Sequence, residues 1–518
     1  MQAVPRMYPI GIQDFEELRK RNCVYVDKTD LIYSLVNNYA TCFLSRPRRF
    51  GKSLLCSTLK AYFQGKKELF KGLAIESLET EWTAREVLHI SFADSKYVEV
   101  DSLKDLLNDT LTQWEALYGS RPTERTFNLR FKGVIRRAYE QSGKQVAVLI
   151  DEYDSPILDA ISADKETLRT DLRTTLRGFF KPLKDSGVYI RLLFITGITK
   201  FSQMGIFSEL NHIGSVSMHP KYSTICGITE TELLTQFKPD IALLAENNNE
   251  TYDEACAHLK QMYDGYHFTR KSEEIYNPYS VINVFDSLEY GRYWYSTGTP
   301  TFLVEMVKNS SFIPETLESC EAVDSMFDRP VENLTEILPV LYQSGYLTIK
   351  GYDDGIYTLG YPNDEVRYGF VNSLLPAYLG YTEEEGKMSI LAMKKALENG
   401  DAETCMKQMR SFVASVPYEA KSNNESRAEI IFYMIFTLLG QFVQTQVPTA
   451  IGRSDVVVRN KKYIYIFEIK VHGTADDGLA QIERQHYAAS YETDTRQVVR
   501  VGVQYDAETR GITEWKVE

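Results

Sequence analysis

The chain has 518 residues, more than one hydrophobic core usually organises, so we expect two to four domains. Hydrophobic residues make up 43% and charged residues 25%, which is typical of a folded, water-soluble protein. The formal net charge of −13 argues against a pure nucleic-acid-binding protein, because phosphate contacts favour a basic face. It leaves room for an enzyme that meets phosphates through a local patch or a metal ion.

No segment predicts export or membrane insertion. The first eleven residues lack the apolar stretch of a signal peptide. The longest apolar run, Ile430 to Leu439, is about half of what a membrane-spanning helix needs. The seven cysteines lie far apart without a C-x-x-C pair, which favours a reducing compartment over a disulfide framework. These features predict a cytoplasmic protein without membrane contact.

Residues 1–235 alternate short β-branched apolar runs with longer helical stretches. That alternation predicts a parallel α/β sheet with helices between its strands. The predicted strands are Thr41–Ser45, Val87–Phe92, Val146–Ile150 and Val188–Thr196.

A phosphate-binding loop follows the first predicted strand. The sequence RPRRFGKS leads directly into a helical pattern, as a P-loop requires. The loop N–H groups and the positive helix end cradle phosphate oxygens, Lys52 adds a point charge, and the Ser53 hydroxyl ligates Mg²⁺. The motif is imperfect, because Arg46 stands where a glycine is expected. The residues predicted to bind nucleotide here are Arg46, Arg48, Arg49, Phe50, Gly51, Lys52, Ser53 and Leu54.

The three arginines of this loop have two interpretations. Arg46, Arg48 and Arg49 either contact phosphate or nucleic acid, or pin the loop to neighbouring carboxylates. The sequence leaves both open.

Two further strand ends fit an ATPase. The strand Val146–Ile150 is followed by Asp151, placed to ligate the metal ion, and Glu152, placed beside the attacking water. The last predicted strand ends in Thr196, where a polar sensor residue would lie. In such an enzyme another strand separates the acidic strand from the P-loop strand, and we expect Val87–Phe92 to take that place.

The rest of the chain divides into three predicted parts. Residues 236–380 are predicted to form a helical lid and a winged-helix-like region. Within it, the pattern of 334–370 predicts a helix, a strand, a turn and a second strand. A helical connector covers 381–421. The pattern of residues 422–518 predicts a helix, a β-hairpin, a second helix and a strand, and therefore a separate α/β domain.

The C-terminal hairpin gathers charged residues at one end. Asp455 begins one arm, and Glu468 and Lys470 share one face of the other, because side chains alternate along a strand. This set suits metal-assisted phosphodiester hydrolysis, with Asp455 and Glu468 holding Mg²⁺ and Lys470 orienting water or stabilising developing charge. An isolated Glu-x-Lys pair also occurs in ordinary surface hairpins, so the prediction depends on Asp455 and on the flanking helices.

Those helices carry further candidates. Glu425 and Glu429 are one turn apart on the preceding helix, so either can face the hairpin. Gln481 lies on the following helix, where it could hold a water molecule or a phosphate oxygen.

Together these segments resemble a bacterial family of two-part proteins, which join an AAA-like ATPase domain to a PD-(D/E)xK nuclease-superfamily domain. The resemblance is carried by YVDKT at 25–29, RPRRFGKS at 46–53, IDEYD at 150–154, GITKFS at 197–202, YDGY at 263–266, YNPYS at 276–280, QSGYL at 343–347, YPNDEV at 361–366, GRSD at 452–455 and FEIK at 467–470.

The resemblance implies a P-loop NTPase fold followed by a restriction-endonuclease-like α/β domain, in a bacterial cytoplasm. It implies ATP and Mg²⁺ as cofactors, with Mn²⁺ also suitable at the nuclease site, and DNA or RNA as substrate. It places the family's helix acid on Glu425 rather than Glu429, and the arginine at position 46 is the family's own habit. Gln446 departs from the family, which often carries an acid there.

Three functions follow as hypotheses. The first is an ATPase that controls a Mg²⁺-dependent nuclease, and a homo-oligomer is compatible with it. The second is a nucleotide-dependent switch or scaffold whose nuclease fold binds without cleaving. The third, a translocating ATPase, lacks a helicase motif series in this sequence.

Overall fold

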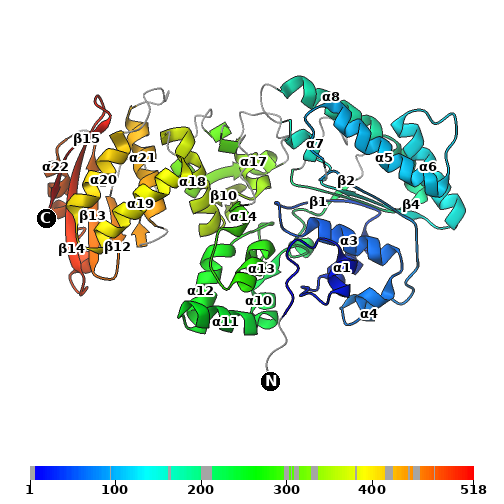
Figure 1. Ribbon diagram of the computed structural model, residues 1–518, viewed down its shortest axis with the longest axis horizontal. Helices are drawn as coiled ribbons and strands as arrows, with labels where there is room; N and C mark the ends of the chain where they lie inside the picture. Colours follow the sequence, from blue (N-terminus) through cyan, green and yellow to red (C-terminus); the bar gives the residue numbers. More distant parts are fainter. Residues whose placement is uncertain are drawn as a thin grey trace. The chain divides into compact units, whose positions relative to one another are not determined.

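In the computed structural model the chain forms two compact units (Figure 1). The first comprises 1–294 with 321–363, and the second comprises 295–320 with 364–518. The division into four domains predicted from the sequence stays a prediction. The residues described are 6–93, 95–160, 165–199, 213–296, 303–304, 306–307, 314–327, 337–379, 382–414, 424–440, 444–446, 455–471 and 473–518.

A five-stranded parallel sheet organises the first unit, in the order β2-β3-β4-β1-β5. Helices cover both faces, so the central strands carry continuous apolar runs, and β3 is buried along its whole length. The strands are β1 (Thr41–Ser45), β2 (Val87–Ser91), β3 (Val146–Asp151), β4 (Ile190–Gly197) and β5 (Gly214–Ser215). The predicted parallel α/β sheet is confirmed, although the fourth strand begins at Ile190 because Gly187–Tyr189 forms a 3₁₀ turn.

One prediction about this sheet is wrong. The strand between the P-loop strand β1 and the acidic strand β3 is β4, not the predicted Val87–Phe92 strand. β2 lies on the far side of β3, at the edge of the sheet. The order of strands depends on which crossovers the helices make, and periodicity along the chain does not contain that information.

The helices that cover this sheet lie in two layers, one on each face (Figure 1). One layer holds α5, α6 and α8, joined by aromatic stacking of Phe131 on Trp114 and on Phe179. The opposite layer holds α1, α3 and α4. The bounds are α1 Phe15–Lys20, α2 Thr29–Asn38, α3 Lys52–Phe63, α4 Ile75–Leu78, α5 Val100–Tyr118, α6 Phe127–Ser142, α7 Ser155–Leu158, α8 Glu166–Phe180 and α9 Pro182–Asp185.

A helical lid follows the sheet in sequence. Thr229 and Thr251 begin two of its helices with capping boxes, and Leu233, Phe237 and Leu259 contribute to its own buried core. Its elements are β6 Ile228–Thr229, α10 Glu230–Gln236, α11 Lys238–Asn248, α12 Tyr252–Tyr263, β7 Ile275–Tyr276 and α13 Pro278–Ser287. The short helix α14, Tyr293–Ser296, follows and contains the point where the first unit ends and the second begins.

The predicted helix, strand, turn and strand after the lid are present. Asp354 and Gly355 both have positive φ, 42° and 91°, which matches a two-residue hairpin turn that favours glycine. A third strand, β8, pairs with β10. The elements are β8 Cys320–Val323, α16 Asp324–Phe327, α17 Ile337–Ser344, β9 Thr348–Asp353 and β10 Ile356–Gly360, and residues 334–336 of the predicted helix lie outside the described ones.

The second unit contains a five-stranded mixed sheet in the order β11-β12-β13-β14-β15. β13 and β14 are parallel and the other neighbours antiparallel, so α22 forms a crossover between β13 and β14. The sequence predicted one strand after this helix, whereas the structure has two, and β11 adds a further edge. The strands are β11 Gln444–Gln446, β12 Asp455–Arg459, β13 Tyr463–Lys470, β14 Gln497–Asp506 and β15 Gly511–Val517.

Helices of this unit pack against its sheet. Phe436 of α21 packs on Phe467, whereas Leu479 and Ile482 of α22 cluster with Ile464 and Ile466. The helices are α18 Asp364–Leu379, α19 Glu383–Glu398, α20 Ala402–Ala414, α21 Asn424–Leu439 and α22 Ala475–Arg484. In the part of the chain that the structure describes, no helix is long and apolar enough to cross a membrane.

Candidate nucleotide and nuclease sites

The predicted phosphate-binding loop connects β1 to α3. Arg49 and Gly51 have φ of 64° and 91°, so the loop makes two left-handed steps before the helix begins. Turns of this kind make anion-binding concavities of N–H groups, and the α3 N-terminus adds partial positive charge. Lys52 is buried, and its ammonium donates a hydrogen bond to the Pro47 carbonyl at 3.1 Å. The lysine side chain therefore lies back along the loop.

Arg46 is fixed differently from the other two arginines of the loop. It is 2% exposed, whereas Arg48 and Arg49 are exposed. Its guanidinium lies 4.1 Å from the centre of the Phe268 ring, and burial lowers its pKa to about 10. It donates hydrogen bonds to the carbonyls of Ser45, Ser217, Tyr222 and Ser223. This geometry corrects both interpretations of Arg46, because the side chain pins the loop through carbonyls rather than carboxylates or phosphate.

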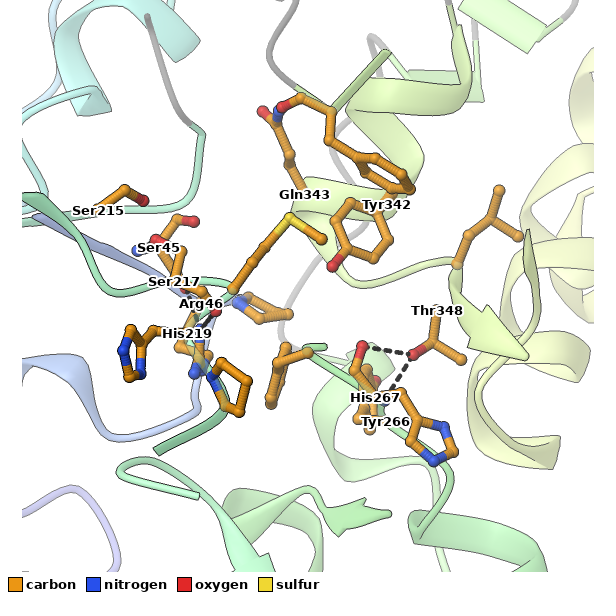
Figure 2. A pocket seen from close by; sticks show the side chains of 16 residues that line it. Ser45, Arg46, Ser215, Ser217, His219, Tyr266, His267, Tyr342, Gln343 and Thr348 are labelled. Carbon is orange, nitrogen blue, oxygen red and sulfur yellow. Dashed lines mark hydrogen bonds between the residues drawn. The ribbon is translucent and has the colours of Figure 1, made fainter. Parts of the chain in front are cut away.

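A cavity of about 400 Å³ adjoins Arg46 (Figure 2). The start of the P-loop forms one wall, and Tyr342, Gln343 and Thr348 of the helix–hairpin segment form another. Thr348 joins that wall to the lid, because its hydroxyl accepts from the His267 N–H at 2.7 Å. The loop thus borders free space on the side of Arg46.

The predicted acidic residues lie at the carboxyl ends of β3 and β4. The Thr196 hydroxyl donates to the Asp151 carboxylate at 2.6 Å, and both side chains are buried. Glu152 follows with φ of 49°, and burial raises the pKa of its carboxyl, while the nearby Lys52 charge lowers it. Glu152 therefore lies close enough to Lys52 for the two charges to interact. The structure brings Lys52, Asp151, Glu152 and Thr196 together at one edge of the sheet.

Sequence reasoning missed Asp154 as a site residue. Its carboxylate is 1% exposed and accepts from the N–H groups of Ile198 and Thr199 and from the Thr199 hydroxyl, at 2.7–3.0 Å. A side chain at Gly197 would meet Asp154 Oδ1 at 2.6 Å. Asp154 thus fixes the end of the Thr196 strand to the acidic loop. The third acid of IDEYD was the available signal, but its partners lie 44 residues or more away.

A small apolar pocket of about 90 Å³ lies against the other end of the P-loop. Gly51 and Leu54 line it from the loop and α3, Tyr25 lines it from the N-terminal segment, and Ile228 and Phe237 line it from the lid. It is bounded by apolar side chains from three separate segments of the first unit.

The predicted nuclease residues lie on neighbouring strands of the second unit. Asp455 pairs directly with Glu468 in the antiparallel register of β12 and β13. Glu468 is 1% exposed, and the Lys470 ammonium donates to its Oε1 at 2.8 Å and also to the Gln481 side-chain oxygen of α22. The structure thus brings Glu468, Lys470 and Gln481 into one hydrogen-bonded group.

Asp455 and Glu425 are described by their backbone positions alone, Asp455 at the start of β12 and Glu425 in the first turn of α21. Residues 452–454 and 200–202 of two quoted motifs lie outside the described ones. Gln446 ends β11 and pairs with Val457.

The residues present fit a divalent metal ion at this hairpin. Glu468 Oε2 is buried and has no hydrogen-bond partner among the described residues, although a buried carboxylate oxygen normally has one. A metal ion held jointly with Asp455 would satisfy it. Among the side chains that the structure describes, no three His, Cys, Asp or Glu residues form a metal-binding group, and the Asp455 side chain is outside that set.

This arrangement of two sites defines the class of the protein. The chain belongs to the family of proteins that carry an AAA-ATPase-like domain and a PD-(D/E)XK nuclease superfamily domain in one polypeptide. Residues 9–207 match the family described as predicted AAA-ATPase, and residues 423–515 match the PD-(D/E)XK nuclease superfamily. Over 524 residues, 98% of each chain, it is 32% identical to an uncharacterized protein in the vnfD 5' region of Azotobacter chroococcum mcd 1. No solved structure matches the chain.

Proposed function

We propose that the first unit binds and hydrolyses ATP, and that ATP controls a metal-dependent nuclease in the second unit. The observation that supports the ATPase best is the order β3-β4-β1, which puts the acidic, sensor and P-loop strand ends side by side. The apolar pocket beside Gly51 suits the adenine base, because it offers a dry slot for a planar ring next to the loop. Arg48 and Arg49, which are exposed, remain candidates for phosphate contact.

In this proposal each residue of the nucleotide site has a separate task. Lys52 leaves the Pro47 carbonyl for a phosphate oxygen, while loop N–H groups bind the others. Ser53 and Asp151 hold Mg²⁺, which neutralises charge on the phosphates when bound. Glu152 orients the attacking water and accepts its proton, and its raised pKa suits that task. Thr196 fixes the rotamer of Asp151 through its hydroxyl.

At the hairpin, Asp455 and Glu468 would hold the metal ion, which polarises the phosphodiester and lowers the pKa of bound water. Lys470 is already fixed by Glu468 and Gln481, so its charge stands ready for the attacking water or for the developing negative charge. Glu425 completes the proposed catalytic set from α21. The substrate is nucleic acid, since the family is a nuclease superfamily.

Cleavage and its control are tested together. Purified protein is incubated with plasmid, single-stranded DNA and RNA, each with and without ATP, in Mg²⁺ and in Mn²⁺. We expect metal-dependent cleavage whose rate changes with ATP. Hydrolysis of ATP without cleavage of any nucleic acid in either metal would leave the alternative, a nucleotide-dependent switch whose nuclease fold only binds.

A further inference from the structure

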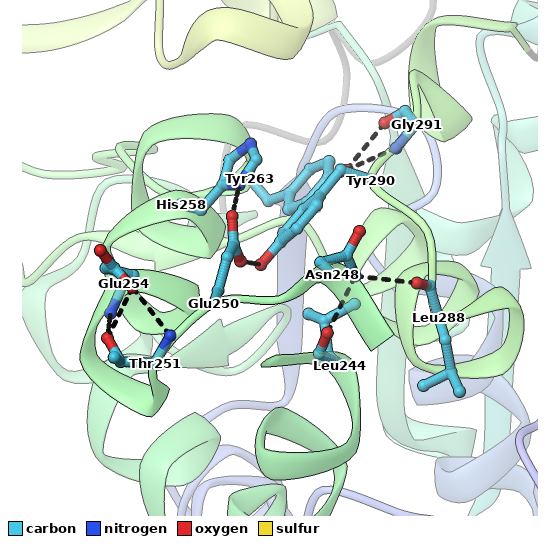
Figure 3. A network of polar contacts seen from close by, with 10 residues as sticks. All are labelled: Leu244, Asn248, Glu250, Thr251, Glu254, His258, Tyr263, Leu288, Tyr290 and Gly291. Atoms are coloured by element: carbon cyan, nitrogen blue, oxygen red, sulfur yellow. Dashed lines mark hydrogen bonds and ion pairs between the residues drawn. The ribbon is translucent and has the colours of Figure 1, made fainter. Parts of the chain in front are cut away.

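The chain between Leu288 and Trp294, here the exit segment, is held to the lid at Leu288, Tyr290 and Gly291 (Figure 3). Ring stacking contributes as well, because the His258 ring lies on Tyr290 with centroids 3.6 Å apart. The hydrogen bonds join Asn248 to the Leu288 carbonyl, Tyr290 to Glu250, and Tyr263 to both backbone groups of Gly291, all at 2.7–3.0 Å. The exit segment is therefore held to the lid by hydrogen bonds and ring stacking.

The exit segment ends at Trp294, which touches the P-loop. The indole N–H of Trp294 donates to the Arg48 carbonyl at 2.9 Å, and the side chain is 5% exposed. Its ring packs on Tyr346 at 5.3 Å between centroids, and its backbone N–H donates to the Ser280 hydroxyl. Arg48 lies inside the loop, two residues after Arg46, so its peptide shifts if the loop changes shape.

Other residues of the loop are held by the same half of the unit. A Cβ atom at Gly345 would lie 2.6 Å from the Pro47 ring, so the hairpin segment is in close contact with the loop there. The Arg49 guanidinium lies 5.0 Å from the centre of the Tyr279 ring, and Phe50 packs edge-on against Tyr266 at 4.8 Å. The loop therefore packs directly against both the lid and the hairpin segment, so its conformation depends on where these two lie.

The next residue, Tyr295, belongs to the second unit. Its backbone N–H donates to Glu365 at 3.5 Å, and a side chain at Gly369 would meet its ring at 2.4 Å. Glu365 and Gly369 both lie on α18, the first long helix of that unit. Two consecutive residues are therefore attached to different units, Trp294 to the P-loop and Tyr295 to α18.

We propose that Trp294 is the positioning residue that transmits the nucleotide state of the P-loop to α18 of the second unit. The proposal rests on the proposed function and names the route of its control. When phosphates bind the loop N–H groups, the Arg48 peptide reorients and the indole follows its carbonyl. Because the exit segment is held to the lid, the displacement passes to Tyr295 rather than being absorbed in a slack loop.

The test compares two buried tryptophans of the first unit. Trp294→Phe keeps the aromatic packing on Tyr346 and removes the N–H donor. Trp114→Phe, at a site 7% exposed in α5, is the matched control. Hydrogen exchange of the 364–379 peptide is measured with and without a non-hydrolysable ATP analogue, alongside ATP hydrolysis. We expect the analogue to change exchange at least threefold in the parent and in Trp114→Phe, and to leave it unchanged in Trp294→Phe, with KM for ATP within about threefold of the parent.

Each outcome decides the question. An equal analogue-dependent change in Trp294→Phe and in the parent overturns the role of Trp294. A parent that hydrolyses ATP but shows no change at 364–379 overturns transmission to α18 while leaving the ATPase intact. A parent that binds no nucleotide overturns the proposed function, and the relay with it. A Trp294→Phe protein that loses ATP binding altogether shows that the tryptophan shapes the nucleotide site instead.

Discussion

The two sites of this protein are built in different ways. The hairpin site draws Asp455, Glu468, Lys470 and Gln481 from two paired strands and the helix that follows, and its remaining proposed residue, Glu425, from the helix before them. The P-loop takes its contacts from distant segments of the first unit, and its partners include Trp294, 246 residues from Arg48 in sequence. The difference teaches that the hairpin site depends on local alternation and strand register, whereas the P-loop site depends on long-range packing. Changes far from the chemistry should therefore disturb the P-loop and leave the hairpin site unaffected.

The largest expected effect is at the hairpin. Glu468→Ala or Asp455→Ala removes a metal ligand, and cleavage should fall by about a thousandfold or more, since metal catalysis supplies several kcal/mol. Lys470→Ala should lose cleavage while Mn²⁺ binding stays within about threefold, because the lysine acts on water and phosphate. Cleavage rates and Mn²⁺ titrations measure both. Glu483→Gln, an exposed acid on α22, is the control and should behave as the parent. If Glu468→Ala and Asp455→Ala cleaved nucleic acid at the parental rate, the cleavage activity would come from another site or from a contaminant.

Arg46→Gly restores the glycine of the P-loop motif, yet we expect it to destabilise the first unit by about 3 kcal/mol. The change removes hydrogen bonds to four carbonyls and the packing on Phe268, and it enlarges the adjoining cavity. Urea unfolding followed by tryptophan fluorescence measures it. Arg49→Gly, which is exposed, should cost under about 1 kcal/mol. A glycine variant at position 46 as stable as the parent would show that the pinning contributes nothing.

Lys52→Ala should weaken ATP binding about ten- to a hundredfold, since a charge-assisted hydrogen bond is worth about 1.5–3 kcal/mol. Glu152→Gln should keep ATP bound and slow its hydrolysis, because it removes only the proton acceptor. Calorimetric titration and phosphate release separate the two defects. Equal ATP affinity of Lys52→Ala and the parent would contradict the P-loop assignment. Neither change should alter cleavage measured without ATP.

The smallest effect is a difference in pH sensitivity. Burial raises the pKa of the Asp264 carboxyl in the lid to about 7, helped by Glu274 and Glu230 and opposed by Lys260. The carboxyl is protonated in the folded state below that pH, so its contribution to stability is present at low pH and lost as pH rises through about 7. Asp264→Asn should therefore raise the free energy of unfolding by about 1.5 kcal/mol at pH 8, after loss of the Lys260 attraction.

At pH 4 the same variant should show a much smaller gain, because Asp264 is protonated in the folded state and already about half protonated in the unfolded state, where its pKa is about 3.9. Urea unfolding at the two pH values measures the difference. Glu246→Gln on the exposed face of α11 is the control, with no pH-dependent gain expected. A gain of the same size at both pH values would show that the substitution acts through packing.

Much of the fold could be read from local sequence. Thr41–Ser45 is a strand with the bounds that its apolar run predicts, and the alternation of Glu468 and Lys470 puts both on the α22 side of β13. The prediction about the Val87–Phe92 strand was wrong, and Asp154 was missed. Both depend on which parts of the chain meet across the sheet, and neither has a signature within a few residues.

The sequence by itself determined the strand, loop and helix around Lys52, the acidic strand end at Asp151, and the hairpin with its Glu-x-Lys face. These follow from periodicities of 2 and 3.6 residues and from glycine at a left-handed position, which are properties of neighbouring residues. Only the tertiary structure decided that β4 separates the two nucleotide-site strands, that Arg46 binds carbonyls, and that Trp294 reaches the P-loop. Those contacts join segments up to 246 residues apart, and their energies come from burial and hydrogen bonds formed after the chain has packed.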